Sequence, residues 1–332
     1  MTKVYVGTAQ GLFVAGIVGD RDYQLDLVGF ERSDVGAIRS PVVASREGRL
    51  FVATTRSGVW RSDDLGASWQ EANRGLVSKE VWALQQHPTS GEIYAGTGPV
   101  GVYKSEDASG SWVEFEALRA MPSRADWFLH MAPFYARVRS IAIAEAEPVV
   151  VCGIEEGWIV RTDDRGETWH SEREGLGGDV HMVAICPGDI AVVFAATGTG
   201  MFRSSDGGRT FARCDDVDRP YVTHVLTHPE RPGMVFAVAS HNLPRFWRRS
   251  EGAGTAFYLS HDYGKSWSRL ERGYPDFIAA GAHAATWAIQ DPDLLLVGLT
   301  DGSIWRIDND GGGAVWLECG KPVTALSVLD IA

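Results

Sequence analysis

Short apolar runs with the same surroundings recur along the whole chain. Each is followed by a small residue, a Gly- or Thr-containing turn and a second run that carries an aromatic residue. Apolar runs of about four to eight residues bounded by turn residues are typical of buried β-strands. The strand pairs begin at Val4, Leu50, Ile93, Val149, Val193, Val235 and Leu295. The pattern therefore predicts seven copies of one strand-rich unit.

The unit length and the two ends of the chain indicate how these copies assemble. Dividing 332 residues by seven gives about 47 residues a unit, the usual size of a four-stranded propeller blade. The chain begins on the second strand of a unit, and residues 323–329 form a first strand with no second strand after it. We therefore predict an all-β fold, a single seven-bladed β-propeller domain of four-stranded antiparallel blades over residues 1–332, closed by the C-terminal strand.

An eight-residue turn motif follows the aromatic strand in most units. It has Ser or Thr first, Asp third, Gly fifth, Ser or Thr seventh and an aromatic residue eighth, and intact copies span residues 62–69, 162–169, 204–211 and 260–267. Residues 105–112 form a degenerate copy, and residues 308–316 form a looser one. We expect the Asp to accept backbone N–H groups, the Gly to supply a positive φ and the aromatic ring to wedge between sheets. Because the motif recurs from blade to blade, its role is structural.

This motif is the Asp box, and nearly the whole chain resembles the Asp-box (BNR-repeat) propellers of the sialidase-like superfamily. That group includes sialidases, xyloglucan-active glycosidases, sortilin-type receptors and photosystem II assembly factors, so the resemblance implies the fold and leaves the function open. Sialidases carry an Arg-x-Pro motif, and residues 39–41 read Arg-Ser-Pro at a similar place. Their Glu-x-Arg stretch is absent from residues 53–58, so sialidase activity is not expected, and Arg39 is interpreted as a strand-edge cation.

The net charge and the hydropathy of the chain disfavour nucleic acids and membranes as partners. The chain has 31 Lys and Arg against 43 Asp and Glu, a net charge of -12, with no basic stripe. Nucleic acids and anionic membrane surfaces are therefore unfavourable partners. The first residues lack the apolar run and cleavage site of a signal peptide, and no apolar stretch approaches the roughly 18 residues of a membrane helix. We expect a cytoplasmic protein without a membrane partner.

Two connections are longer than their counterparts, and both fall on the face opposite the eight-residue turns. They lie between Trp112 and Val138 and between Ser240 and Ser260. Long loops in a compact repeat fold are often functional. We predict that they cover a pocket for a small organic or carbohydrate-like ligand. The candidate ligand-binding residues are Trp127, Phe128, His130, Tyr135, Arg139, His241, Arg245 and Trp247.

Three histidines lie near the starts of successive innermost strands, where their side chains could meet on the axis: His181, His224 and His283. Imidazoles from neighbouring strands suit Zn, Fe, Cu or Ni. We therefore predict that this trio holds a transition metal ion or acts in acid–base catalysis.

Two alternatives remain open, and with them the question of whether the chain is an enzyme. The first is a non-enzymatic propeller that docks a protein, as the assembly factors and receptors of the resembling group do. The second is a glycoside hydrolase, which needs two carboxylates about 5 to 10 Å apart. The candidates on suitable loops are Glu80, Glu155, Glu156, Asp276 and Asp301, and nothing in the sequence selects two of them.

Overall fold

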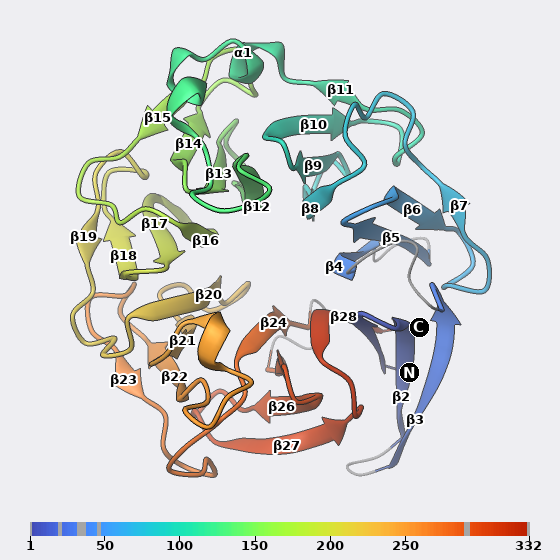
Figure 1. Cartoon of the computed structure of the whole chain (residues 1–332), viewed down its shortest axis with the longest axis vertical. Helices are drawn as coiled ribbons and strands as arrows, with labels where there is room; N and C mark the ends of the chain where they lie inside the picture. Colours follow the sequence, from blue (N-terminus) through green and yellow to red (C-terminus); the bar gives the residue numbers. More distant parts are fainter. Residues whose placement is uncertain (1, 19–21, 32–37, 45–47, 289–292, 331–332) are drawn as a thin grey trace.

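Seven four-stranded antiparallel sheets surround a central axis in the computed structural model (Figure 1). The structure describes residues 2–18, 22–31, 38–44, 48–288 and 293–330. The predicted seven-bladed β-propeller is confirmed.

Both ends of the chain build one blade. Its strands run outward from the axis as β28 (Val323–Asp330), β1 (Thr2–Thr8), β2 (Gly11–Val18) and β3 (Asp22–Gly29). The pairing of β28 with β1 extends from Thr2 opposite Asp330 to Thr8 opposite Val323. The predicted closure of the ring by the C-terminal strand is therefore confirmed.

The other six blades follow in chain order, each listed from the axis outward. The second and third contain β4 (Ile38–Ala44), β5 (Arg49–Thr54), β6 (Gly58–Ser62), β7 (Gln70–Glu71), then β8 (Val81–Gln86), β9 (Ile93–Thr97), β10 (Gly101–Ser105), β11 (Val113–Glu114). The fourth and fifth contain β12 (Arg137–Ile143), β13 (Val150–Glu155), β14 (Trp158–Thr162), β15 (His170–Glu172), then β16 (Val180–Cys186), β17 (Asp189–Thr197), β18 (Gly200–Ser204), β19 (Ala212–Arg213). The sixth and seventh contain β20 (Tyr221–Thr227), β21 (Val235–Ser240), β22 (Thr255–Ser260), β23 (Ser268–Arg269), then β24 (Ala282–Trp287), β25 (Leu295–Leu299), β26 (Ser303–Ile307), β27 (Gly313–Glu318).

The two enlarged connections contain the helical turns of the described chain. The link from β11 to β12 holds α1 (Glu116–Arg119) and the 3-10 helix η1 (Pro122–Asp126), and the link from β21 to β22 holds the 3-10 helix η2 (Pro244–Phe246). No helix in the described ranges has the length and hydropathy needed to cross a membrane.

The hydrophobic core lies between neighbouring blades. Every residue of β9, β21 and β25 is buried, because both faces of each sheet pack against the next blade. This two-sided burial explains why these strands have continuous apolar sequences where a one-sided sheet would alternate apolar and polar residues. One core cluster, for example, joins Phe51 and Val59 of the second blade to Ile93 and Tyr103 of the third.

The eight-residue turns have the predicted hydrogen bonds. In the turn at residues 62–69, the amide N–H of Gly66 donates to Ser62 Oγ (2.8 Å), and that of Ser68 donates to Asp64 Oδ1 (2.8 Å). The turn at residues 204–211 repeats this pattern, and the degenerate copy keeps it with Ser109 at φ 67°. These bonds, first of all those from the seventh-position residues, lower the pKa of Asp64, Asp107 and Asp164 to about 2.

In two of the turns, the final tryptophan ties its blade to the blade before it. The indole N–H of Trp69 donates to the carbonyl oxygen of Val28 (2.7 Å), and that of Trp112 donates to the carbonyl oxygen of Ala72 (2.7 Å). The prediction that these rings wedge between neighbouring sheets is confirmed for both residues.

Candidate functional site

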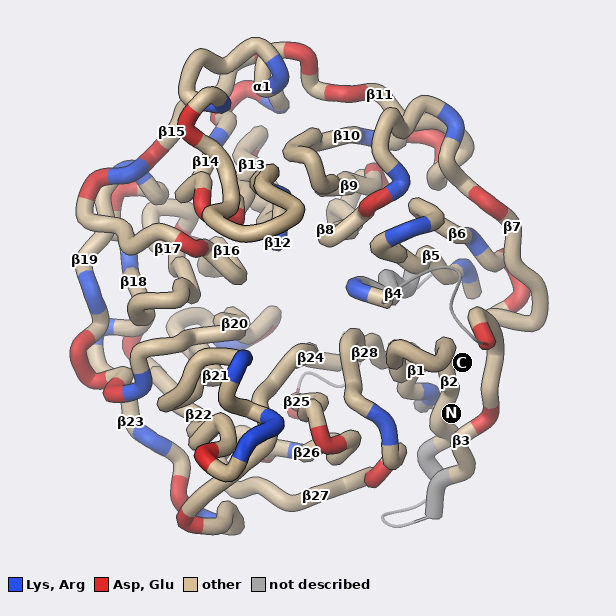
Figure 2. Tube along the Cα trace, in the orientation of Figure 1, with Lys and Arg blue, Asp and Glu red and all other residues tan. Residues whose placement is uncertain are grey.

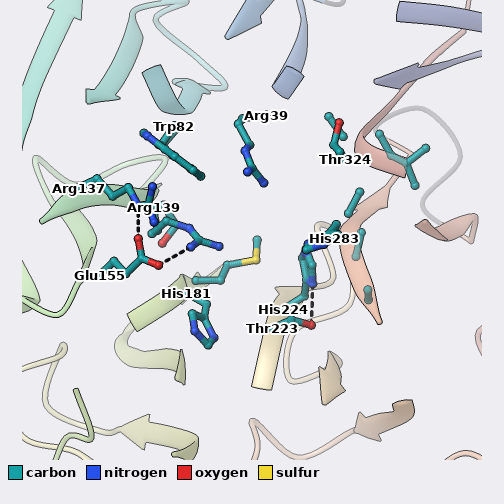
Figure 3. Close-up of a pocket in the computed structure, with 18 of the residues that line it drawn as sticks. Arg39, Trp82, Arg137, Arg139, Glu155, His181, Thr223, His224, His283 and Thr324 are labelled. Atoms are coloured by element: carbon teal, nitrogen blue, oxygen red, sulfur yellow. Dashed lines mark hydrogen bonds and ion pairs between the residues drawn. The ribbon is translucent and has the colours of Figure 1, made fainter. Parts of the chain in front are cut away.

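A cavity of about 410 Å³ lies on the axis of the propeller (Figure 3). All seven innermost strands contribute to its lining, and the loop after β21 adds Pro244 and Trp247. Its volume lies within the range of small-molecule sites.

A β-bulge near the start of each innermost strand places one residue of every blade against this cavity. In β8, for example, Val81 pairs with Thr97 and Ala83 pairs with Gly96, which leaves Trp82 without a partner. A bulge bends its strand and changes the direction of the extra side chain. The seven extra residues, here named the bulge ring, are Arg39, Trp82, Arg139, His181, Thr223, His283 and Thr324. All seven line the cavity.

One side of the ring is cationic. The guanidinium carbons of Arg39, Arg137 and Arg139 lie 4.3, 3.9 and 5.4 Å from the ring centre of Trp82. Such contacts hold the arginines in place without neutralising their charge. The cavity therefore has a fixed group of three positive charges around one indole.

Glu155 at the end of β13 partly compensates this charge. Its carboxylate accepts hydrogen bonds from Arg137 Nε and from Arg139 Nη1 (2.8 Å). Burial raises the pKa of Glu155, but the charge of Arg139 and the bond from Arg137 outweigh burial and hold it below its usual value. Glu155 is therefore an ionised partner for two of the three arginines.

Glu80 lies behind the same arginines. It accepts a hydrogen bond from the indole N–H of Trp82 (2.7 Å) and one from the Tyr135 hydroxyl (2.5 Å). Its Oε1 is 4.0 Å from Arg137 Nη1. Glu80 thus orients Trp82 and adds a second negative charge beside Arg137.

Arg39 is the cation of this group that forms no ion pair with a described residue, although Glu155 attracts it from a distance. Its Nε is buried, and it makes no hydrogen bond or ion pair with the described part of the chain. Burial, followed by repulsion from Arg139 and Arg137, lowers the pKa of Arg39 to about 9, so it stays charged at neutral pH. On the neighbouring strand β28, Thr324 Oγ1 is also buried without a hydrogen-bond partner. Figure 3 shows both side chains at the same cavity. Buried polar atoms of this kind normally have a partner.

The other side of the ring carries the three predicted histidines. His181 Nδ1 lies 2.6 Å from the carbonyl oxygen of Val222, and its Nε2 lies 3.1 Å from Asp179 Oδ2. Both partners accept hydrogen bonds only, so each ring nitrogen of His181 faces a protein acceptor. Burial raises the pKa of Asp179, but the bond from His181 and its charge outweigh burial and lower it.

His224 and His283 are neutral at physiological pH. Burial and the nearby Arg139 lower the pKa of His224 to about 3, and burial and Arg39 do the same for His283. The ring centre of Trp247 lies 5.2 Å from that of His283. His224 Nδ1 lies 3.0 Å from Thr223 Oγ1, so this side of the cavity consists of neutral, partly engaged imidazoles beside an aromatic wall.

The structure brings five of the predicted site residues together at the cavity: Arg139, His181, His224, Trp247 and His283. The other six candidates do not line it: Trp127, Phe128, His130, Tyr135, His241 and Arg245. Trp127 is a core residue between the third and fourth blades, and Tyr135 acts through Glu80. Phe128 and His130 contact each other on the exposed part of the β11–β12 connection, where their rings lie 5.0 Å apart.

Sequence reasoning missed much of the cationic side. Trp82 and Arg137 were not selected, and the interpretation of Arg39 as a strand-edge cation is wrong, because the bulge places it on the cavity. A signal was present, since each bulge-ring residue follows the first buried residue of an innermost strand, such as Ile38, Val81 or Val138. Aligning the seven strands at that residue would have selected the complete ring.

The arrangement gives the predicted metal site no support. Among the described residues, no group of three or more His, Cys, Asp or Glu side chains is placed to hold a metal ion. Both ring nitrogens of His181 already have protein partners. The metal therefore stays a prediction, which metal analysis of the purified protein would test.

Two facing carboxylates are also lacking among the described lining residues. Glu155 lines the cavity, whereas Glu80, Glu156, Asp276 and Asp301 do not. Asp301 instead accepts hydrogen bonds from the backbone and side chain of Ser303. Among the described residues, Glu155 is thus the one predicted carboxylate on the cavity lining.

Comparison with known proteins shows similarity of fold. No family model and no curated protein matches the chain. A GH74 xyloglucanase from Xanthomonas campestris superposes with a TM-score of 0.67 at 15% identity, over 98% of this chain and 52% of that one. An ancestral GH74 enzyme gives 0.60 at 16% identity, over 89% and 38%. YCF48 from Cyanidioschyzon merolae gives 0.62 at 14% identity, over 92% and 90%. The chain spans about two fifths to one half of the GH74 enzymes.

Proposed function

We propose that the axial cavity binds a small, singly charged, carbohydrate-like anion such as a sugar acid. The observation that carries this proposal is Arg39, a charged side chain facing a cavity with its Nε buried and with no hydrogen bond or ion pair to a described residue. An unpaired charge withdrawn from water is unfavourable, and an anionic ligand would relieve that cost. Thr324 Oγ1, also unpartnered, would donate to the same ligand group.

The charge balance favours one negative charge on the ligand. Arg137 and Arg139 already share Glu155, and Arg137 also faces Glu80. Asp179 also faces Arg137 and Arg139 but is engaged by His181, so the three cations and the two remaining carboxylates leave one positive charge. A carboxylate matches that surplus better than a doubly charged phosphate monoester.

The rest of the lining favours a polar, ring-shaped molecule. Trp82, Tyr221 and Trp247 supply aromatic walls, and Ala284, Ala325 and other small residues make the lower lining apolar. Neutral imidazoles can each donate and accept a hydrogen bond, as hydroxyl groups on a sugar require. Orienting polar groups within aromatic walls are usual in small-molecule sites.

Calorimetric titration with sugar acids tests the proposal. We expect glucuronate or galacturonate to bind, and galactose and glucose 1-phosphate to bind at least tenfold more weakly. Arg39→Gln should lose about 10- to 100-fold in affinity, since a charge-assisted hydrogen bond contributes about 1.5–3 kcal/mol. Thr324→Val should lose less, and Arg56→Gln, an exposed arginine outside the cavity, should bind normally. Equal binding by the Arg39 variant would overturn the proposal.

A second candidate function is protein docking, which the apolar tip of the β11–β12 connection favours. Phe128, Met131 and Phe134 are 48%, 74% and 65% exposed. Exposed apolar groups of this size often mark interaction surfaces. A stoichiometric partner retained by the native chain and lost when all three are replaced by Ser would support this candidate, and unchanged retention would contradict it.

We also propose membership of the Asp-box propellers. The shared hydrogen-bond pattern of the turns at residues 62–69, 162–169, 204–211 and 260–267 supports it. A sequence profile built from homologues of this chain should match that group over the four turns.

A further inference from the structure

A loop beside the cavity concentrates positive charge in an otherwise acidic protein. The loop, residues 241–254, carries Arg245, Arg248 and Arg249, all of them exposed, while the whole chain has a net charge of -12. None of the three forms an ion pair with a described residue. Figure 2 shows Lys and Arg positions in blue beside β21, the strand that leads into this loop. We name these three residues the arginine rim.

Contacts within the loop hold two of these arginines in place without neutralising them. The guanidinium carbons of Arg245 and Arg249 lie 4.9 and 5.6 Å from the ring centre of Phe246. A cation above an aromatic face keeps its hydrogen-bond donors available at the edge of the ring. The two charges are therefore positioned for an external anion.

Two residues of the arginine rim are chain neighbours of residues that line the cavity. Pro244 and Trp247 line the cavity, and Arg245 and Arg248 each follow one of them along the chain. The indole N–H of Trp247 donates to the carbonyl oxygen of Asn242 (2.8 Å), which fixes its side chain to the base of the loop. The charge of Arg248 also contributes to the low pKa of His283 inside the cavity. A ligand that fills the cavity and continues outward past Trp247 would therefore meet the arginine rim.

We propose that the ligand is the end of an acidic oligosaccharide, whose terminal sugar acid occupies the axial cavity and whose next carboxylates pair with Arg245, Arg248 and Arg249. This inference rests on the proposed function and adds the length and charge of the ligand. An oligosaccharide brings hydroxyl groups to Thr223, Thr324 and the neutral histidines. An acidic peptide end would bring backbone N–H donors, for which the described lining offers one carboxylate, Glu155, already engaged by arginines.

Comparing a monomer with a trimer separates the rim from the cavity. We expect trigalacturonate or the corresponding glucuronate oligomer to bind the native chain about tenfold more tightly than its monomer, since each exposed ion pair contributes little. This advantage should shrink when salt is raised from 0.05 to 0.5 M, because exposed charges are screened. In Arg245→Gln/Arg248→Gln/Arg249→Gln the ratio should fall to about one while monomer affinity is unchanged.

A matched control removes the same charge elsewhere. The variant Arg213→Gln/Arg269→Gln/Arg306→Gln changes the outermost strands β19 and β23 and the third strand β26, and it should keep the trimer advantage. Equal affinities of monomer and trimer for the native chain, or a trimer advantage that survives loss of the rim, would overturn the inference and leave the cavity site standing. Tight binding of hexaglutamate in place of the trimer would overturn it in favour of a peptide ligand. Loss of monomer binding in the rim variant would overturn the inference that the three arginines bind the next carboxylates and not the terminal sugar. Absence of binding by every sugar acid would overturn the proposed function itself.

Discussion

At the scale of single residues, the charged side chains of the cavity are expected to differ in their effect on the free energy of unfolding. Arg137 and Arg139 are held by Glu155, whereas Arg39 has no described acidic partner. Replacing an unpaired, partly buried charge by an apolar side chain is often neutral or stabilising. We therefore expect Arg39→Met to raise the free energy of unfolding by about 1 kcal/mol in urea denaturation without ligand.

Arg137→Met is the matched comparison, because it leaves Glu155 with one partner fewer. The free energy of unfolding should fall by about 1–3 kcal/mol. If both variants were equally destabilised, the idea that Arg39 is strained in the free protein would be wrong.

The histidines predict a pH dependence of stability. The unfolded state takes up protons below its ordinary histidine pKa of about 6.5, whereas folded His224 and His283 stay neutral until about pH 3. Stability is therefore complete above pH 6.5 and is lost as the pH falls toward 3, by up to about 1.4 kcal/mol per pH unit for each histidine. His224→Gln should reduce this slope between pH 6.5 and 4.5 in urea titrations, and an unchanged slope would contradict the assignment.

The limits of sequence-based prediction are clearest at single residues. His181, His224 and His283 were correctly expected near the axis, because they stand at the starts of strands whose order follows from the repeat. The partnership of Arg137 with Glu155 joins two neighbouring strands of one blade, and only their register brings the charges together. No spacing along the chain encodes that contact.

At the scale of elements, the eight-residue turn is stabilised mainly by its first residue. Ser204 is buried and its Oγ accepts the amide N–H of Gly208 (2.8 Å) while donating to Asp206 (2.6 Å). Ser204→Ala would leave a buried N–H unpaired, at a cost of about 1–3 kcal/mol.

Calorimetry should show this loss as a lower Tm with normal sugar-acid binding, because the turn lies on the face opposite the loops that border the cavity. Ser105→Ala in the degenerate copy removes the corresponding bond to the amide of Ser109 and should have a similar effect. A binding defect in either variant would mean that the turns influence the cavity.

The strand starts explain why the cavity lining was only partly predictable. In a regular strand, successive side chains point to opposite faces of the sheet. The bulge interrupts this alternation after the first buried residue of each innermost strand. Thr223, for instance, is the bulged residue of β20, while His224 resumes the pairing with Val238. The bulge cannot be recognised from the sequence of one strand. It can be recognised when the seven innermost strands are aligned at their first buried residue.

At the scale of the whole molecule, stability depends on ring closure. Strand β28 pairs with β1 along its length and buries Val323, Leu326 and Val328 between the first and last blades. Each of these side chains contributes about 1.5–3 kcal/mol by burial, and their sum approaches the total stability of a typical domain.

A chain ending at Pro322 should therefore lose its cooperative thermal transition and associate through the open edge of β1, as measured by calorimetry and light scattering. A peptide of residues 321–332 added in excess should restore the transition, and a scrambled peptide should not. A truncated chain that melts as the native one does would show that closure contributes little.

The bulge ring also bears on how such a protein diverges. Its seven members are about 40 to 60 residues apart in the chain, so no two of them share a strand, a turn or a neighbouring codon. Each of these residues is the extra residue of a β-bulge and has no partner on the neighbouring strand. Replacing its side chain therefore leaves the strand register unchanged. Seven separate point substitutions could therefore convert this arginine-lined cavity into one of a different chemistry while the blades keep their sequence.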